Sequence, residues 1–156
     1  MLATRLRRAL LWTGIFLLGF LLGAYLFSDT QRRPLVSVTD CHVKNLCLDQ
    51  KQLLGLFSSV GMQKFPGVLP GIVMETEKTV AIKNPFPNAP VDYAVIPKKD
   101  ITDIGQLGDG DRAYLDDAYA VMDRLIARDH LTNYKVVTNG PGYQDVSYLH
   151  FHLIAF

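Results

Sequence analysis

The spacing of apolar and polar residues divides the chain into three segments. Residues 9–27 form an apolar run without a charge, long enough to cross the hydrocarbon core of a membrane as a helix. The next segment begins with a polar stretch and contains two cysteines and one stretch of helical periodicity. The remainder alternates short apolar runs with Pro- and Gly-rich turns. We therefore expect a transmembrane anchor at 1–28, a linker with a cysteine pair and a short helix at 29–64, and a folded domain at 65–156.

The periods of short strands and of helices recur through the rest of the chain. Strands are predicted where β-prone residues stand between turn signals, and helices where apolar residues recur at intervals of three and four. The predicted strands are 72–75, 79–83, 92–97, 134–138 and 144–154, and the predicted helices are 49–63 and 108–128. In the shorter helix the apolar stripe is formed by Leu53, Leu54, Phe57 and Val60. This order predicts an α+β fold with a mostly antiparallel sheet and one main packing helix.

The last predicted strand contains two of the four histidines of the chain. Side chains alternate between the two faces of a strand, so Tyr148, His150, His152 and Ile154 share one face. At about 3.3 Å per residue, the two imidazoles stand roughly 7 Å apart. A neutral imidazole is a nucleophile that can attack phosphorus and form a covalent phosphoramidate. The tail of the chain is therefore the candidate catalytic segment.

This tail and the residues upstream of it resemble the histidine-triad (HIT) superfamily, whose signature is Gln-x-φ-x-His-φ-His-φ-His-φ-φ, where φ is an apolar residue. The signature positions are matched by Gln144, Val146, His150 and His152. Tyr148 stands in place of the first histidine of the triad. Residues 81–85, 87–90 and 93–99 resemble the strand–turn–strand of the family, and the similarity covers roughly 70–156. It implies a HIT-like, mostly antiparallel sheet, preceded here by a single transmembrane helix.

The resemblance also implies a role for each candidate residue. By position, His150 is the nucleophile that attacks the α-phosphate of a nucleotide conjugate, and His152 orients the phosphate or stabilises its charge. Gln144 completes the predicted catalytic set. The predicted nucleotide-binding residues are Asn84 at the ribose, Ile82 and Phe86 at the base, and Asn139, Gly140 and Gly142 in a glycine turn that holds phosphate. No metal and no cofactor is implied for the attack.

Four positions depart from the family pattern. Tyr148 replaces a triad histidine, Asp92 and Asp100 stand where histidine is common, and Asp145 takes a place usually held by Ser or Thr. A carboxylate at the last position repels a phosphate unless it is protonated or paired. Two functions are therefore open. One is a nucleotide phosphoester or phosphoanhydride hydrolase or nucleotidyl transferase, and the other is a catalytically inactive accessory subunit of a membrane protein complex.

Charge bears on the compartment and on the partners. Three arginines, Arg5, Arg7 and Arg8, precede the apolar run, and every acidic residue follows it. The remaining 13 basic and 15 acidic residues give no basic surface, which argues against a nucleic-acid partner. The positive-inside rule places the N-terminus in the cytoplasm and the domain outside it, as in a bacterial inner membrane. A cleaved signal peptide and a mitochondrial import signal, which would lead to the mitochondrial inner membrane, are the alternatives.

The expected partners follow from the anchor and from the resemblance. An anchored site would act on a nucleotide conjugate, and a lipid-linked conjugate would be held closest to it. Gly19 and Gly23 form a Gly-x-x-x-Gly face, which packs against other helices in membranes. We therefore also expect a homodimer or a larger membrane complex.

The linker contains the only two cysteines, Cys41 and Cys47. Their spacing can close a small disulfide ring, which would fit an oxidising compartment. Two free thiols and a zinc site that includes His42 are the alternatives, and the small number of candidate ligands weighs against zinc. The disulfide is the favoured prediction.

Overall fold

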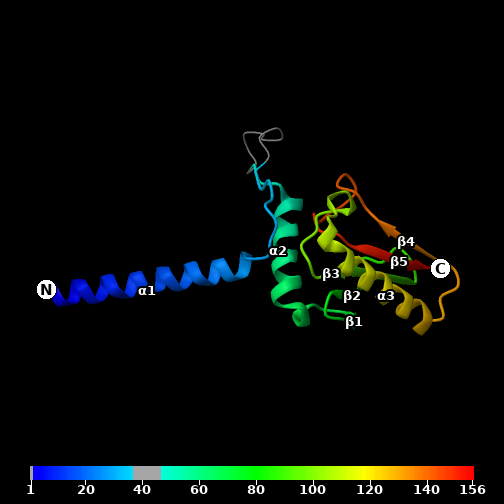
Figure 1. Ribbon diagram of the computed structural model, residues 1–156, viewed down its shortest axis with the longest axis horizontal. Helices are drawn as coiled ribbons and strands as arrows, with labels where there is room; N and C mark the ends of the chain where they lie inside the picture. The colour runs from blue at the N-terminus through cyan, green and yellow to red at the C-terminus, as the bar shows by residue number, and fades with distance from the viewer. Residues whose placement is uncertain (1, 37–46) are drawn as a thin grey trace.

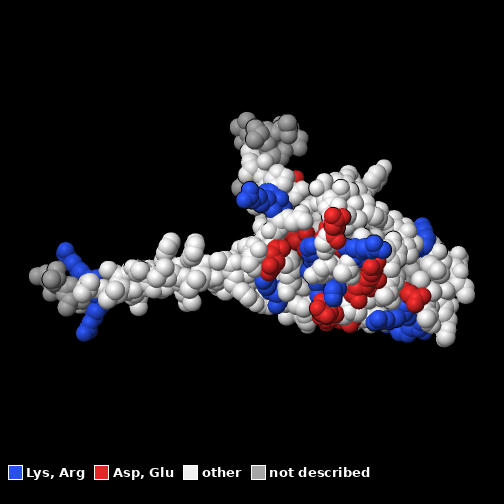
Figure 2. Space-filling view, viewed as in Figure 1, with Lys and Arg blue, Asp and Glu red and all other residues white. Residues whose placement is uncertain are grey.

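The computed structural model describes residues 2–36 and 47–156. A single long helix, α1 (Leu2–Phe27), projects from a domain that contains a sheet and two further helices (Figure 1). From residue 4 onwards α1 is exposed, apart from half-buried Gly23 and Leu26 near its end. Its surface shows no charge between the arginines near its start and the domain (Figure 2). Its mean hydropathy reaches 2.1, so its length and composition are those of a membrane span or a signal sequence.

The domain is built on a five-stranded antiparallel sheet with the strand order β1-β2-β3-β5-β4. The strands are β1 (Ile72–Glu75), β2 (Thr79–Lys83), β3 (Val91–Pro97), β4 (Tyr134–Thr138) and β5 (Phe151–Ala155). β3 and β5 pair in the middle, with Ala94 opposite His152. β3 is buried along nearly its whole length, because both faces of the sheet are covered. The predicted α+β fold is confirmed.

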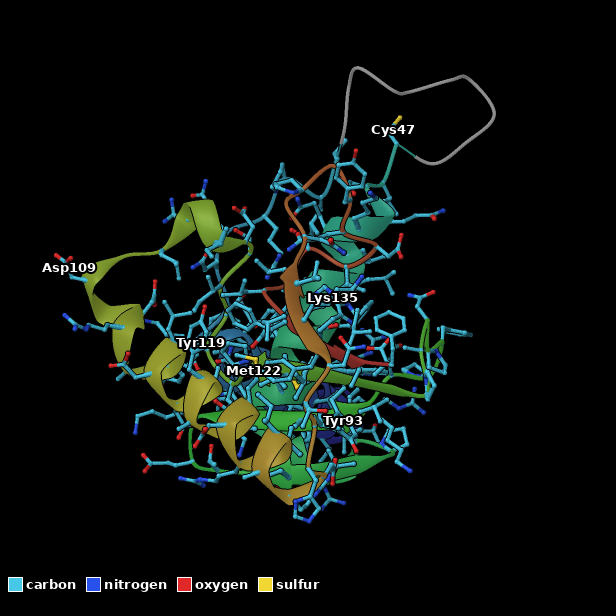
Figure 3. All side chains as sticks on the ribbon, turned by 90° about the vertical axis from the view of Figure 1, so that its right-hand side faces the viewer. Cys47, Tyr93, Asp109, Tyr119, Met122 and Lys135 are labelled. Atoms are coloured by element: carbon cyan, nitrogen blue, oxygen red, sulfur yellow. The ribbon has the colours of Figure 1, made fainter. Side chains whose placement is uncertain are left out.

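One face of the sheet packs against α3 (Arg112–Arg128), the predicted main packing helix, which follows the short 3₁₀ turns Ile104–Gln106 and Asp109–Asp111. The buried residues of α3 are Ala118, Val121, Met122 and Leu125, and their spacing puts them on one stripe. Met122 lies on the side of α3 that faces the sheet (Figure 3). These side chains and the apolar residues of the sheet beneath them form the larger hydrophobic core. Full burial of one large apolar side chain contributes about 1.5–3 kcal/mol to the stability of the fold.

Part of the other face of the sheet packs against α2 (Gln50–Lys64), which is followed by a 3₁₀ turn at Pro66–Val68. The N–H of Gln52 donates to Asp49 Oδ1 at 3.1 Å, so Asp49 is the N-cap of the helix. The sequence assigned this helix to the linker, whereas Met62 of α2 packs with residues of the sheet in a second, smaller core.

The apolar stripe predicted for α2 is wrong as a packing face. The buried residues of α2 are Gly55, Ser59 and Met62, whereas Leu54 and Phe57 are 49% and 61% exposed. The reason is the close approach of the chain at Gly55, where an added Cβ would lie 2.4 Å from the carbonyl oxygen of Ser147. Only the small-residue side of the helix fits against the domain at this point.

This contact predicts opposite effects for two glycine substitutions in α2. Gly55→Ala is expected to lower the free energy of unfolding by about 1–3 kcal/mol, because the added methyl group overlaps a backbone atom. Gly61→Ala meets no atom within 4 Å and is expected to raise it by about 0.5–1 kcal/mol through helix propensity. Denaturant unfolding of both variants in detergent measures the difference. Equal effects of the two substitutions would contradict the close approach.

The tail differs from its predicted form. β5 begins at Phe151, so the prediction of a strand from residue 144 is wrong for 144–150, which form a loop. The N–H of Ser147 donates to the carbonyl of Lys51 at 3.1 Å, and that of Leu149 donates to Ile101 at 2.6 Å. These backbone groups are bonded to α2 and to the loop after β3, so the sheet ladder starts later.

The two cysteines are only partly described. Cys47 is not a free cysteine, whereas Cys41 lies outside the described residues. The pairing of the two stays a prediction, and so do the domain boundaries at residues 28 and 64.

Candidate active site

A pocket of about 520 Å³ lies on the side of the sheet that faces α2, within the usual size range of small-molecule sites. The predicted site residues among its lining are Ile82, Asn84, Phe86, Asn139, His150 and His152. Ser58 and Met62 of α2 line the same pocket, as do Tyr148 and exposed Asp145. The structure therefore brings together residues from the sheet, from the tail loop and from the helix that the sequence placed in the linker.

His150 immediately precedes β5, and its tautomer is fixed by one contact. Its Nδ1 lies 2.8 Å from the carbonyl oxygen of Tyr148. A carbonyl can only accept, so in the neutral ring Nδ1 carries the proton and Nε2 keeps its lone pair. The hydroxyl of Thr138 donates to the carbonyl of His150 at 3.0 Å and fixes the backbone. The Nε2 lone pair of neutral His150 is therefore held in one orientation, as a nucleophile requires.

The surroundings of His150 favour this neutral form. Burial lowers the pKa of His150 below its ordinary value of 6.5, and neighbouring His152 lowers it further. The hydrogen bond to Tyr148 and the charge of Asp145 act in the opposite direction, but the net shift is downward. Near neutral pH the ring is therefore ready to attack without first losing a proton.

His152 is held by Asp92. His152 Nδ1 lies 3.2 Å from Asp92 Oδ1, and the two imidazoles meet edge to face with centroids 5.1 Å apart. The other oxygen of Asp92 accepts from Asn84 Nδ2 at 2.8 Å and from the N–H of Asn88 at 3.2 Å. Burial alone would raise the pKa of Asp92, but these hydrogen bonds and His152 keep it below its ordinary value. An ionised Asp92 accepts a hydrogen bond from His152 Nδ1 and so orients that ring.

Asp92 is the residue of the candidate site that sequence reasoning missed, because its mismatch to the family pattern was treated only as a departure. The alternation of side chains along the two strands could have indicated that Asp92 lies beside His152. Ala94 pairs with His152 across β3 and β5, so Asp92 is the diagonal neighbour of that histidine on the same face.

Tyr148 does not act as a triad residue here. Its side chain is buried, and its hydroxyl donates to the carbonyl of Pro97 at 2.9 Å. Burial raises the pKa of Tyr148 well above its ordinary value. Tyr148 is therefore a neutral part of the pocket wall, and its hydroxyl is bonded to the sheet and not to the imidazoles.

Several predicted residues lie apart from the pocket lining. Gln144 is only 2% exposed, and neither it nor Gly140 and Gly142 lines the pocket. The carbonyl of Gly140 accepts from the N–H groups of Tyr143 and Gln144, so these two donors are used inside the turn. Asn84 does line the pocket, but its amide group holds Asp92, and its oxygen accepts from the N–H of Phe86 at 3.1 Å.

The residues that line the pocket indicate which groups would contact a bound phosphate. In the described part of the chain it includes no lysine or arginine. A bound phosphate would therefore contact His150, His152 and the amides of Asn88 and Asn139. The chemistry that fits this set is attack by one imidazole while the second, with its carboxylate, balances charge on phosphorus oxygens.

Comparison with known proteins places this geometry in a family. The family model described as "Scavenger mRNA decapping enzyme C-term binding" matches residues 69–156. A protein named "Uncharacterized HIT-like protein" from Chlamydia muridarum is 38% identical over 86 residues, which are 53% of this chain and 68% of the relative.

Solved structures agree with the sequence match. A HIT family hydrolase from Clostridium thermocellum superimposes with a TM-score of 0.57 at 27% identity, covering 62% of this chain and 89% of the other. A histidine triad nucleotide-binding protein from Candida albicans gives a TM-score of 0.50 at 26% identity, covering 60% and 71%. The chain thus belongs to the HIT-like superfamily, in the family that the matching model describes.

Proposed function

We propose that this protein is a membrane-anchored hydrolase or nucleotidyl transferase that acts on nucleotide conjugates through His150. The observation that carries the proposal is the fixed tautomer of His150, whose Nδ1 bonds to Tyr148 and whose Nε2 keeps a lone pair beside a pocket of substrate size. The superfamily relatives include a protein named a HIT family hydrolase and one named a nucleotide-binding protein.

The reaction has two displacements. His150 Nε2 attacks the α-phosphorus, the bond from phosphorus to the leaving oxygen breaks, and the leaving group departs with the bonding electrons and takes a proton from solvent. A water or another acceptor then attacks the phosphoramidate, the N–P bond breaks, and His150 is regenerated as a nucleoside monophosphate or its ester leaves. Splitting one displacement into two is the general advantage of a covalent intermediate.

The pocket wall supports a nucleotide in particular. Ile82, Ile96 and exposed Phe86 offer apolar surface for a base, and Asn139 and Asn88 offer amide groups near the histidines. An apolar wall with a few convergent polar groups is the usual make-up of a small-molecule site.

The membrane part of the proposal is supported by contacts at the end of α1. Lys64 Nζ lies 2.6 Å from Asp29 Oδ2 and 4.6 Å from the centroid of the Tyr25 ring, and Gln63 donates to the carbonyl of Asp29 at 3.3 Å. These contacts tie α1 to the domain and favour an uncleaved anchor. With the arginines of the N-terminus in the cytoplasm, the domain faces outward from a bacterial inner membrane, where a lipid-linked nucleotide is the favoured substrate.

The pH dependence of turnover tests the proposal. Full-length protein in detergent is assayed with a soluble nucleoside 5′-phosphate ester and with a lipid-linked cytidine diphosphate, and kcat/KM is followed from acid to neutral pH. Because only neutral His150 attacks, kcat/KM falls as pH drops through its pKa, and burial places that pKa below 6.5. Asp92 stays ionised over this range because its pKa is also lowered. An acid limb centred above pH 6.5, or no turnover of either substrate, would contradict the proposal.

A second function is favoured by one observation. Asp145 lines the pocket as an exposed carboxylate, and it opposes the binding of a phosphate. The corresponding proposal is a catalytically inactive accessory subunit of a membrane complex. Recovery of untagged partners in stoichiometric amount from mild detergent, together with no turnover, would favour this second function over the first.

A further inference from the structure

The outward face of α2 carries large apolar side chains that the domain does not cover. Leu54 and Phe57 are 49% and 61% exposed, and Leu53 and Val60 are half-buried. The residues of α2 that are buried against the domain are Gly55, Ser59 and Met62. A helix with an apolar outward face is stable there when a second apolar surface lies against it.

The end of α1 lies on this same face. Lys64 follows Phe57 by seven residues, which is close to two full turns, so the two side chains project from one side of α2. Lys64 Nζ bonds to Asp29 and lies 3.1 Å from Ser28 Oγ. In Figure 1, α2 runs across the end of α1 and not along it. A bilayer spanned by α1 would therefore face the outward side of α2.

The charge of α2 fits a lipid surface. The helix contains no aspartate or glutamate. Lys64 is paired with Asp29, which leaves Lys51 of the helix and Arg32 of the linker before it as the exposed basic side chains. Helices that lie in the headgroup region combine apolar side chains with basic residues, and the basic residues are attracted to anionic lipids.

We propose that the outward face of α2 rests on the surface of the bilayer in which α1 is anchored, with Leu54 and Phe57 at the boundary between headgroups and acyl chains. This rests on the proposed anchoring of α1. Because Ser58 and Met62 of the same helix line the pocket, the pocket lies about one helix diameter, ~10 Å, from the lipid surface. A phosphate still attached to a lipid can be presented to the site at that distance.

Tryptophan fluorescence in vesicles tests the proposal. The chain has one tryptophan, Trp12, in α1, so Phe57→Trp in a Trp12→Phe background reports on α2 alone. The matched control is Tyr134→Trp in the same background, because Tyr134 is 45% exposed on β4, which lies at the far end of the domain from α1 (Figure 1). Full-length proteins are placed in phosphatidylcholine–phosphatidylglycerol vesicles with or without brominated acyl chains.

The proposal expects the fluorescence of the Phe57→Trp protein to be quenched by brominated lipid and shifted to shorter wavelength, with no such change for the Tyr134→Trp control. Trp12 in the wild type reports separately on insertion of α1. If Trp12 is quenched but Phe57→Trp behaves like the control, the anchor stands and the seating of α2 is wrong. If Trp12 is not quenched either, anchoring and seating both fail. If Phe57→Trp is shielded from lipid and from aqueous iodide alike, a protein covers the face and the proposal is overturned.

Discussion

His150→Ala is expected to lower kcat/KM for a nucleotide conjugate by at least about a thousandfold, because it removes the attacking atom of the first displacement. The ring is half-buried just before the start of β5, and the backbone carbonyl of His150 stays bonded to Thr138, so the fold is expected to persist. Steady-state turnover, with circular dichroism as a check of folding, measures the effect.

The matched control for this substitution is His130→Asn. His130 is exposed in the turn after α3 and has a backbone φ of 51°, a conformation that asparagine also tolerates. Turnover is expected to be unchanged in this variant. Wild-type turnover by His150→Ala would show that another group attacks phosphorus, and equal losses in both variants would point to a general effect of removing a histidine.

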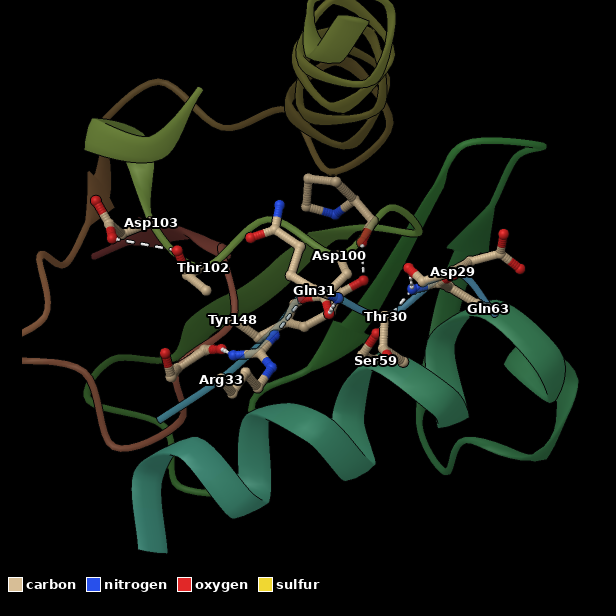
Figure 4. Close-up of polar contacts among 12 residues, drawn as sticks. Asp29, Thr30, Gln31, Arg33, Ser59, Gln63, Asp100, Thr102, Asp103 and Tyr148 are labelled. Carbon is tan, nitrogen blue, oxygen red and sulfur yellow. Dashed lines mark hydrogen bonds and ion pairs between the residues drawn. The ribbon is translucent and has the colours of Figure 1, made fainter. Parts of the chain in front are cut away.

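Arg33→Met is expected to lower the free energy of unfolding by about 3–5 kcal/mol, because it leaves a buried carboxylate without its partner. The Arg33 guanidinium forms an ion pair with Asp100 Oδ1, and both side chains are only 1% exposed. Asp100 Oδ2 accepts the N–H of Gln31 at 2.8 Å, and the guanidinium also donates to the carbonyl of Ser147 (Figure 4). The linker after α1 is thereby held to the loop that leads to His150.

Two further variants make this prediction specific. Combining Arg33→Met with Asp100→Leu removes both charges and is expected to recover most of the lost stability, as replacement of buried ion pairs by apolar residues does elsewhere. Arg32→Met alters the exposed neighbour and is expected to change stability by no more than about 0.5 kcal/mol. Denaturant unfolding in detergent compares the variants. A loss in Arg33→Met no larger than in Arg32→Met would mean that the ion pair contributes nothing.

The periodic parts of the sequence were sufficient to predict the fold. The wrong predictions occur where segments distant in sequence approach each other closely. The stripe of α3 and the strand at 92–97 were identified because each buries one regular face against a broad surface. In α2 the apolar periodicity predicted the wrong packing face, because apolar residues occur on several sides of this helix. The face that packs is set by Gly55, whose missing side chain lets the loop at Ser147 approach. The alternating pattern of the tail starts at residue 144, well before β5 begins at Phe151, because the backbone of the intervening loop bonds to α2 and to Ile101.

In the candidate site, too, residues were predicted where local spacing sufficed and were missed where their roles depend on distant partners. The positions of His150 and His152 followed from their spacing and from the resemblance, and the structure places both in one pocket. Asp92 and Asp100 were judged by what they replaced, whereas their roles depend on partners 60 and 67 residues away in sequence. Such contacts are set by strand register and by the path of the linker, which a single sequence does not specify.

The central claim is that His150 Nε2 forms a covalent bond to phosphorus, and intact mass spectrometry of the full-length protein tests it most directly. After brief incubation with a nucleotide conjugate at neutral pH, we expect a mass increase of one nucleotidyl group that maps to His150, disappears in mild acid and is absent from His150→Ala. Turnover of the conjugate without any such adduct, or the same adduct on His150→Ala, would contradict the account.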